Sequence, residues 1–144
     1  MNAIGTGWAA ENSTEIRRIR GIEVYSRIFE LPEQDVPAAM SARVGSVFAE
    51  EAFAAAGGPA WAHPGLTARD RSIAIVAALA AQGVSGDRLT THLRLAGNHG
   101  IGHDELTALM TLLANYIGYP YASAVMESVE SSAESGLLVE DEQA

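Results

Sequence analysis

The chain has 144 residues, a net charge of −9 and a hydrophobic fraction of 48%, which is too apolar for a disordered protein. Its longest apolar run, Ile73 to Ala81, is far shorter than the roughly 20 residues of a membrane span, so we expect a soluble protein with one core. The absence of cysteine excludes disulfides, thiolate metal sites and thiol redox chemistry, and nine arginines without a basic stripe argue against nucleic acid.

The N-terminal region carries no secretory signal pattern and leads into an amphipathic helix. The first twenty residues lack the order of basic, apolar and small-residue segments that marks secretion, so we expect a cytoplasmic protein. Isoleucines at helical spacing, with arginines between them, predict a helix from Thr14 to Phe29, capped by Ser13 or Thr14. Pro32 is expected to stop it, because proline disfavours helical geometry in the residue before it.

A second helix is predicted over residues 35–56, either continuous or interrupted at Gly45. The run Gly57-Gly58-Pro59 is expected to close it. Residues 60–66 then predict a loop that holds Trp61 and His63. Such a loop is either a packed corner or the wall of a pocket.

The third predicted helix is the most apolar one. Thr67 and Asp70 have the spacing of a capping box, and from Ile73 onward the helix is apolar on nearly every side until Gly83 ends it. We therefore expect protein to surround it, in a multi-helix core or in a subunit interface.

Three more helices complete the predicted fold. The first is expected over roughly residues 86–98, with Ser85 as its cap. The second is expected to start at Gly102, and the third has Pro120 as its first helical residue. No alternation typical of strands occurs, so the sequence predicts an all-α single domain of five or six helices, with a core over about residues 14–134. The acidic tail 135–144 is expected to fray.

His92 shares a helix face with Leu89, Leu93 and Ala96. A histidine on an apolar face is more often a hydrogen-bonded core residue than a catalyst, so the residue alone favours a structural role, bonded to a carbonyl or to Glu105. A metal site is not expected, because carboxylates at ligand spacing are missing around the four histidines.

Arg69 and Arg71 lie in the first turn of the predicted helix that begins after Thr67. Cations at this end oppose the helix dipole, so another group must offset them. An acidic side chain is slightly favoured for this role, and an anionic ligand is the functional alternative.

Four motifs in order now support a resemblance. They are W-x-x-P-G-L-x-x-R-x-R-S at 61–72, H-x-x-x-A-x-x-x-G at 92–100, D-E-L at 104–106 and Y-x-G-x-P at 116–120. Over about residues 20–130 the chain resembles the carboxymuconolactone decarboxylase family, in the all-helical alkylhydroperoxidase D-like superfamily. The resemblance implies that fold and a ring-shaped homo-oligomer, a trimer or hexamer. Peroxidase-like members carry C-x-x-C where this chain has Ser85 and Arg88, so the match points away from a thiol peroxidase and to the cofactor-free decarboxylases.

The resemblance implies a carbon–carbon lyase that decarboxylates a lactone. Electrons left by carbon dioxide would flow into the lactone carbonyl, giving a dienolate that is protonated on carbon. His92 would be the general acid or would polarise the lactone oxygen, and the resemblance now favours it as a site residue. Arg71, and less directly Arg69, would hold a substrate carboxylate, while Trp61 or Tyr116 would give the departing carboxylate a drier environment.

Two departures from the family pattern bear on the substrate. His63 replaces the usual arginine of W-x-R-P-G-L, and Gly102 replaces the usual threonine or serine cap. Histidine would grip a carboxylate less firmly than arginine, and only when protonated. The alternatives are therefore another lactone or keto acid, in the catabolism of aromatic compounds or in a biosynthetic pathway, or a non-catalytic binding or assembly protein.

Overall fold

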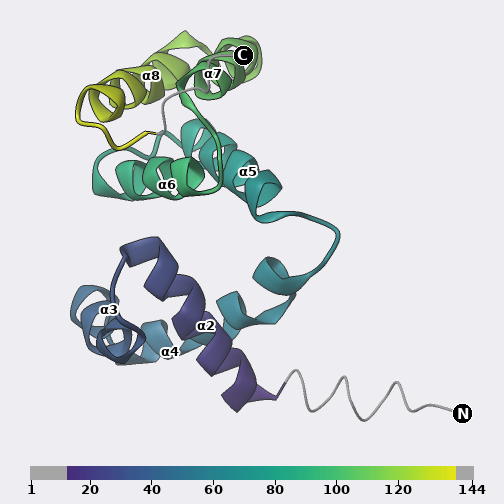
Figure 1. Cartoon of the computed structure of the whole chain (residues 1–144), viewed down its shortest axis with the longest axis vertical. Helices are drawn as coiled ribbons and strands as arrows, with labels where there is room; N and C mark the ends of the chain where they lie inside the picture. The colour runs from purple at the N-terminus through teal and green to yellow at the C-terminus, as the bar shows by residue number, and fades with distance from the viewer. Residues whose placement is uncertain (1–12, 139–144) are drawn as a thin grey trace, which may run out of the picture. The chain divides into compact units, whose positions relative to one another are not determined.

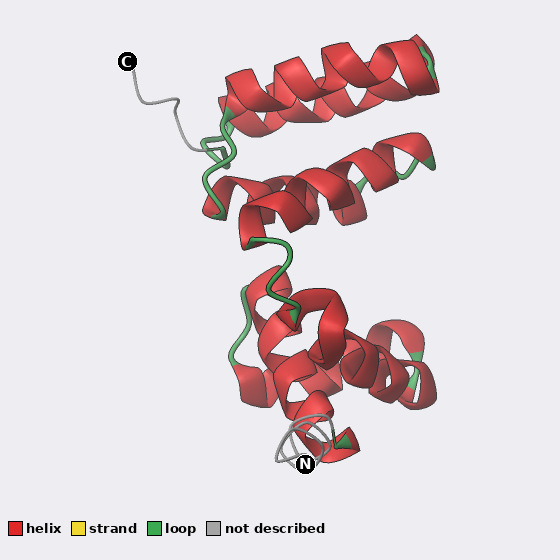
Figure 2. Cartoon of the chain, turned by 90° about the vertical axis from the view of Figure 1, so that its right-hand side faces the viewer, coloured by secondary structure: helices red, strands yellow, loops and turns green. Residues whose placement is uncertain are grey.

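The computed structural model describes residues 13–138. This part of the chain consists of helices joined by loops, without strands, which confirms the predicted all-α class (Figure 2). None of its helices has the length and apolar character that crossing a bilayer requires. The contacts divide the chain into two compact units, Met1–Gly65 and Leu66–Ala144, so the single domain stays a prediction.

The first described helix of the first unit is the one that the isoleucine spacing predicted. Ser13 caps it, accepting a hydrogen bond from the Ile16 N–H, and Glu30 ends it in the left-handed conformation just before Leu31-Pro32. Gly45, with φ of +82°, separates the next two helices, which confirms the predicted interruption. In chain order the elements are α2 (Thr14–Phe29), η1 (Glu33–Asp35), α3 (Val36–Val44), α4 (Ser46–Ala55) and η2 (Ala56–Ala60) (Figure 1).

Close helix contacts hold the first unit together. Phe53, Val36 and Ala49 are fully buried in its core. α2 crosses α4 at Gly21, where a Cβ would lie only 1.8 Å from the Phe53 carbonyl oxygen. A side chain at this position would keep the two backbones apart, so glycine is required by the packing.

The helix end predicted at residues 57–59 is confirmed, because α4 ends at Ala55 and Gly58 in η2 breaks the helical path with φ of −91° and ψ of −158°. Gly57 beside it packs against α2 so closely that a Cβ would lie 1.7 Å from the Arg17 carbonyl oxygen. Trp61 and Ala62 are helical again after this break, so the loop is shorter than the predicted residues 60–66.

The second unit contains α5 (Ala68–Ala81), α6 (Asp87–Asn98), α7 (His103–Ile117) and α8 (Tyr119–Glu134) (Figure 1). The Thr67–Asp70 capping box is confirmed, with both hydrogen bonds at 3.0 Å. The predicted starts of α6 and α8 need correction. Gly86 rather than Ser85 precedes α6, since its φ of +69° turns the chain, and Pro120 is the second residue of α8 because Gly118 already ends α7.

One core joins the four helices of the second unit, and α5 packs against all three of the others. Val76 and Ala80 on α5 are fully buried, but Ala74 and Ala78 are exposed, so the described helices of the second unit do not cover α5 on every side. Alanine methyl groups expose little apolar area, which makes this arrangement tolerable. Leu138 is buried in the same core rather than frayed, and the rest of the acidic tail, 139–144, lies outside the described residues.

Candidate active site

His92 lies on α6, one turn before the helix reaches Ala96. Its ring is half-buried, and its Nδ1 atom is buried without a hydrogen-bond partner in the described part of the chain. Glu105, the partner considered from the sequence, is engaged elsewhere. A buried polar atom without a partner costs free energy, so its presence calls for an explanation such as a function or a missing ligand.

The surroundings of His92 keep its ring neutral. Burial lowers the pKa of His92 below the usual 6.5, and the positive charge of Arg94 lowers it further. At neutral pH the imidazole is therefore mostly uncharged, with one nitrogen protonated and one free to accept a proton. A negatively charged ligand beside it would raise the pKa again and favour the protonated ring.

Arg69 pairs with Glu105, joining the first turn of α5 to the first turn of α7. Glu105 also accepts a hydrogen bond from the Gly102 N–H at 3.3 Å, while Gly102 has no side chain to cap a first-turn N–H in return. An acidic side chain thus offsets this cation, as the sequence slightly favoured. Because both side chains are nearly half-exposed, the pair contributes little to stability and is open to exchange with another carboxylate.

Arg71 is buried, and its Nη1 donates to the carbonyl oxygen of Leu66 at 2.5 Å. This bond fixes the chain just before α5. The guanidinium therefore has a structural task in addition to any contact with an anion.

Sequence reasoning missed a second polar pair in this unit. The hydroxyl of Ser72, which is 2% exposed, lies 2.7 Å from Nδ1 of His99, so α5 is tied to the C-terminal end of α6. Ser72 follows Arg71 directly, and His99, the C-cap of α6, is seven residues after His92 in the middle of that helix. The two residues are 27 positions apart, and no local spacing could have indicated the pair.

The other predicted site residues lie at three further places. In the first unit, Trp61 is half-buried and donates its backbone N–H to the Gly58 carbonyl, while His63 is exposed and accepts the Gly65 N–H on Nδ1 at 3.0 Å. In the second unit, Tyr116 at the end of α7 is 80% exposed. Tyr116 therefore offers no dry environment within a single chain.

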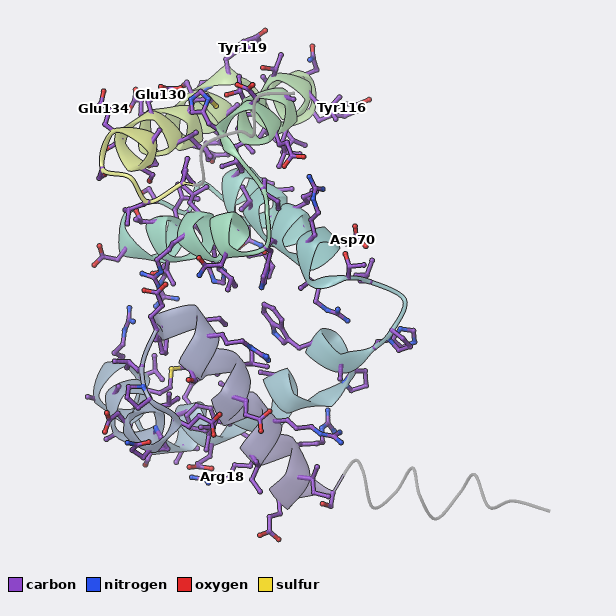
Figure 3. All side chains as sticks on the ribbon, in the orientation of Figure 1. Arg18, Asp70, Tyr116, Tyr119, Glu130 and Glu134 are labelled. Atoms are coloured by element: carbon purple, nitrogen blue, oxygen red, sulfur yellow. The ribbon has the colours of Figure 1, made fainter. Side chains whose placement is uncertain are left out.

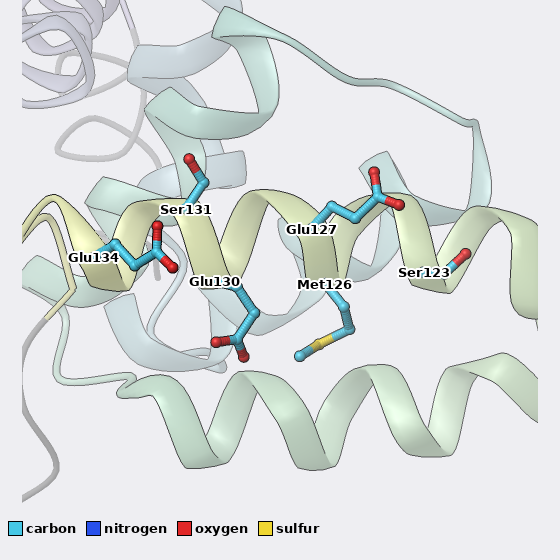
Figure 4. A pocket seen from close by; sticks show the side chains of 6 residues that line it. All are labelled: Ser123, Met126, Glu127, Glu130, Ser131 and Glu134. Carbon is cyan, nitrogen blue, oxygen red and sulfur yellow. The ribbon is translucent and has the colours of Figure 1, made fainter.

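A shallow hollow lies along α8, and none of the predicted site residues lines it (Figure 4). Glu127, Glu130 and Glu134 line it, and Figure 4 shows Glu130 on the side of α8 that faces α7. There its carboxylate is 2.6 Å from Nε2 of His103. Such an acidic surface repels carboxylates, so this hollow is unsuited to the expected substrate. Within residues 13–138, no group of three or more metal-ligating side chains is placed to hold a metal ion.

Comparison with known proteins identifies the family. Residues 48–131, which include His92 and both arginines of α5, match the sequence profile described as the carboxymuconolactone decarboxylase family. The chain belongs to this family. It is also 39% identical over 73 residues to 4-carboxymuconolactone decarboxylase of Acinetobacter baylyi, an alignment that covers 51% of this chain and 54% of that protein.

The alignment thus spans about half the length of this curated relative. No solved structure significantly matches the chain. Membership in the carboxymuconolactone decarboxylase family and the all-helical architecture agree with the motifs read from the sequence.

Proposed function

We propose that this chain is a cofactor-independent decarboxylase that acts on a carboxylated lactone or a related small acid. The observation that carries the proposal is the half-buried ring of His92, whose Nδ1 has no partner within the described residues. A histidine kept for packing would normally have its buried nitrogen hydrogen-bonded. Family membership and the similarity to a protein named 4-carboxymuconolactone decarboxylase support the same reading.

The reaction proceeds in two steps. The bond to the departing carboxylate breaks, and its electron pair passes through a carbon–carbon double bond to the lactone carbonyl oxygen, giving carbon dioxide and a dienolate. One proton then adds to carbon and restores the lactone. His92 either donates its ring N–H to the developing oxyanion or, once protonated, delivers the proton to carbon.

The lowered pKa of His92 has a consequence for this mechanism. Before the substrate binds, the ring is mostly neutral at pH 7, and the carboxylates of the substrate then raise its pKa and bring a proton to it. If the protonated ring is the active form, kcat/KM falls as pH rises above the pKa of the free enzyme, which lies below 6.5.

Arg69 and Arg71 hold a carboxylate of the substrate in this proposal. Arg69 becomes available when the substrate displaces Glu105 from it, which exchanges one exposed ion pair for another at little cost. Arg71 contributes a buried positive charge that the Leu66 carbonyl already orients.

We propose that the active form is a homo-oligomer. Large apolar and aromatic side chains near the junction of α7 and α8 are exposed, with Leu112 at 56%, Tyr116 at 80% and Tyr119 at 71%. Figure 3 shows Tyr116 and Tyr119 pointing away from the ribbon. Clusters of this kind are typical of interaction surfaces, and contact with a second copy would also give Tyr116 a drier environment.

Two measurements on the purified protein distinguish a catalyst from a binding protein. The first follows carbon dioxide release from 4-carboxymuconolactone, and the second follows the melting temperature with added di- and tricarboxylic acids. A decarboxylase releases carbon dioxide in proportion to enzyme concentration. A melting shift without carbon dioxide release would instead identify a binding protein. The absence of both responses would contradict a carboxylate ligand.

A further inference from the structure

The first unit contains an arginine that none of the motifs above includes. Arg17 lies in the first turn of α2, and its Nε is buried without a hydrogen-bond partner. Within residues 13–138 no ion pair or side-chain hydrogen bond holds its guanidinium. Arginine stays charged at every physiological pH, so this part of the chain contains a partly desolvated cation that lacks a counter-ion.

The position of this guanidinium is set by Gly58 in η2. A Cβ at Gly58 would lie 2.0 Å from Nη2 of Arg17, 2.7 Å from Cζ and 2.8 Å from Nε. The missing side chain therefore provides the space that the guanidinium occupies beside the turn. Nε is buried by this arrangement, whereas the terminal nitrogens are not among the buried unpartnered atoms.

A cation in the first turn of a helix is opposed by the helix dipole, and burying one of its nitrogens adds a desolvation cost. The neighbouring residue shows the ordinary solution, because Arg18 donates to Glu50 through two nitrogens at 2.6 and 3.1 Å. Arg17 has no such acid in the described structure. A guanidinium whose outer edge is free is suited to bind a carboxylate through two parallel hydrogen bonds.

We infer that Arg17, seated on Gly58, is a carboxylate-binding residue of this protein. The inference rests on the proposed function for the class of ligand, a small organic acid. Gly58 and Trp61 share a backbone hydrogen bond, so the bound carboxylate would lie beside the segment that leads to His63. His63 is exposed and already accepts the Gly65 N–H, and Arg17 would supply the permanent charge that position 63 lacks.

The test uses succinate as the probe and the full-length protein. The Nε–H signal of Arg17 and the backbone N–H signal of Gly58 are followed by NMR during a succinate titration, with uncharged succinamide as the ligand control. Three variants are compared with the wild type. Arg17→Lys keeps the charge but loses the fork, Gly58→Ala displaces the guanidinium, and Arg18→Lys alters the adjacent arginine that is already paired.

The inference predicts saturable shifts of both signals with succinate and none with succinamide. Affinity should fall about tenfold or more in Arg17→Lys and in Gly58→Ala, and should stay within about twofold in Arg18→Lys. Gly58→Ala should fold normally, because its methyl group meets only the end of a flexible side chain. If it does not fold, Arg17→Lys decides the question alone.

The inference is overturned if succinate leaves both signals unchanged or if Arg17→Lys binds it as tightly as the wild type. These outcomes are independent of turnover. Succinate binding at Arg17 without carbon dioxide release from the lactone would contradict only the proposed function. Carbon dioxide release with an unchanged KM in Arg17→Lys would contradict only the role of Arg17.

Discussion

Replacing His92 by leucine separates a site histidine from a structural one. Leucine removes the imidazole and its buried unpartnered Nδ1 while keeping an apolar side chain of similar size. A buried polar atom without a partner costs about 1–3 kcal/mol, and we take the low end because the ring is only half-buried. We therefore expect His92→Leu to gain about 1 kcal/mol of unfolding free energy, or roughly 3 °C in melting temperature for a chain of this size.

His99, the C-cap of the helix that carries His92, provides the matched control. Its Nδ1 lies 2.7 Å from the hydroxyl of Ser72, which is 2% exposed, so His99→Leu leaves that hydroxyl buried without the imidazole. We expect this variant to lose about 1–3 kcal/mol. If the unfolding free energy rises in His92→Leu and falls in His99→Leu, then His99 stabilises the fold and His92 destabilises it.

The assay is urea and thermal unfolding at pH 8, repeated at pH 5. The folded-state pKa of His92 is lowered, so below pH 6.5 the unfolded chain takes up protons before the folded chain does. The wild type therefore loses no stability to protonation of this group above pH 6.5, and it loses stability as pH falls from 6.5 toward the folded-state pKa. His92→Leu escapes that loss, and its advantage should be larger at pH 5. A loss of more than about 1 kcal/mol at pH 8 would refute the reasoning and make the ring a structural element.

Three further variants test the packing and the local electrostatics. Gly21→Ala should lose about 3 kcal/mol or more in urea unfolding, because its Cβ would meet the Phe53 carbonyl oxygen, and unchanged stability would contradict the close crossing of α2 and α4. His103→Asn should be less stable than the wild type at pH 5.5 and equal to it at pH 9, since hydrogen bonding to Glu130 raises the pKa of His103 and this stabilisation is lost as pH rises through that pKa. A difference that does not change with pH would argue against the ion pair. Thr67→Ala should lose about 1 kcal/mol with the capping box, as thermal unfolding can measure.

Helix ends that depend on local hydrogen bonds were predictable from the sequence. The cap at Ser13, the break at Gly45 and the capping box of Thr67 and Asp70 each involve groups a few residues apart, so their chemistry is visible in a short stretch. Ser85 failed as a cap because the neighbouring Gly86, with a positive φ of +69°, precedes the helix itself.

Features that depend on distant residues were not predictable in the same way. Gly57 in η2 lies against the backbone of Arg17, 40 positions earlier in the sequence, and no local pattern indicates that contact. The sequence indicated that an acid should offset Arg69, but not that Glu105 would supply it across 36 positions. The roles of His92, Arg69 and Arg71 in binding and proton transfer stay predictions, since they require a substrate to be tested.

The central claim is that His92 handles the proton in a decarboxylation that needs no cofactor. The most direct measurement compares carbon dioxide release from 4-carboxymuconolactone by the wild type and by His92→Gln, after unfolding curves have shown that both are folded. The account predicts a rate about a hundred- to ten-thousandfold lower for the variant. A folded His92→Gln protein with nearly the wild-type rate would contradict it.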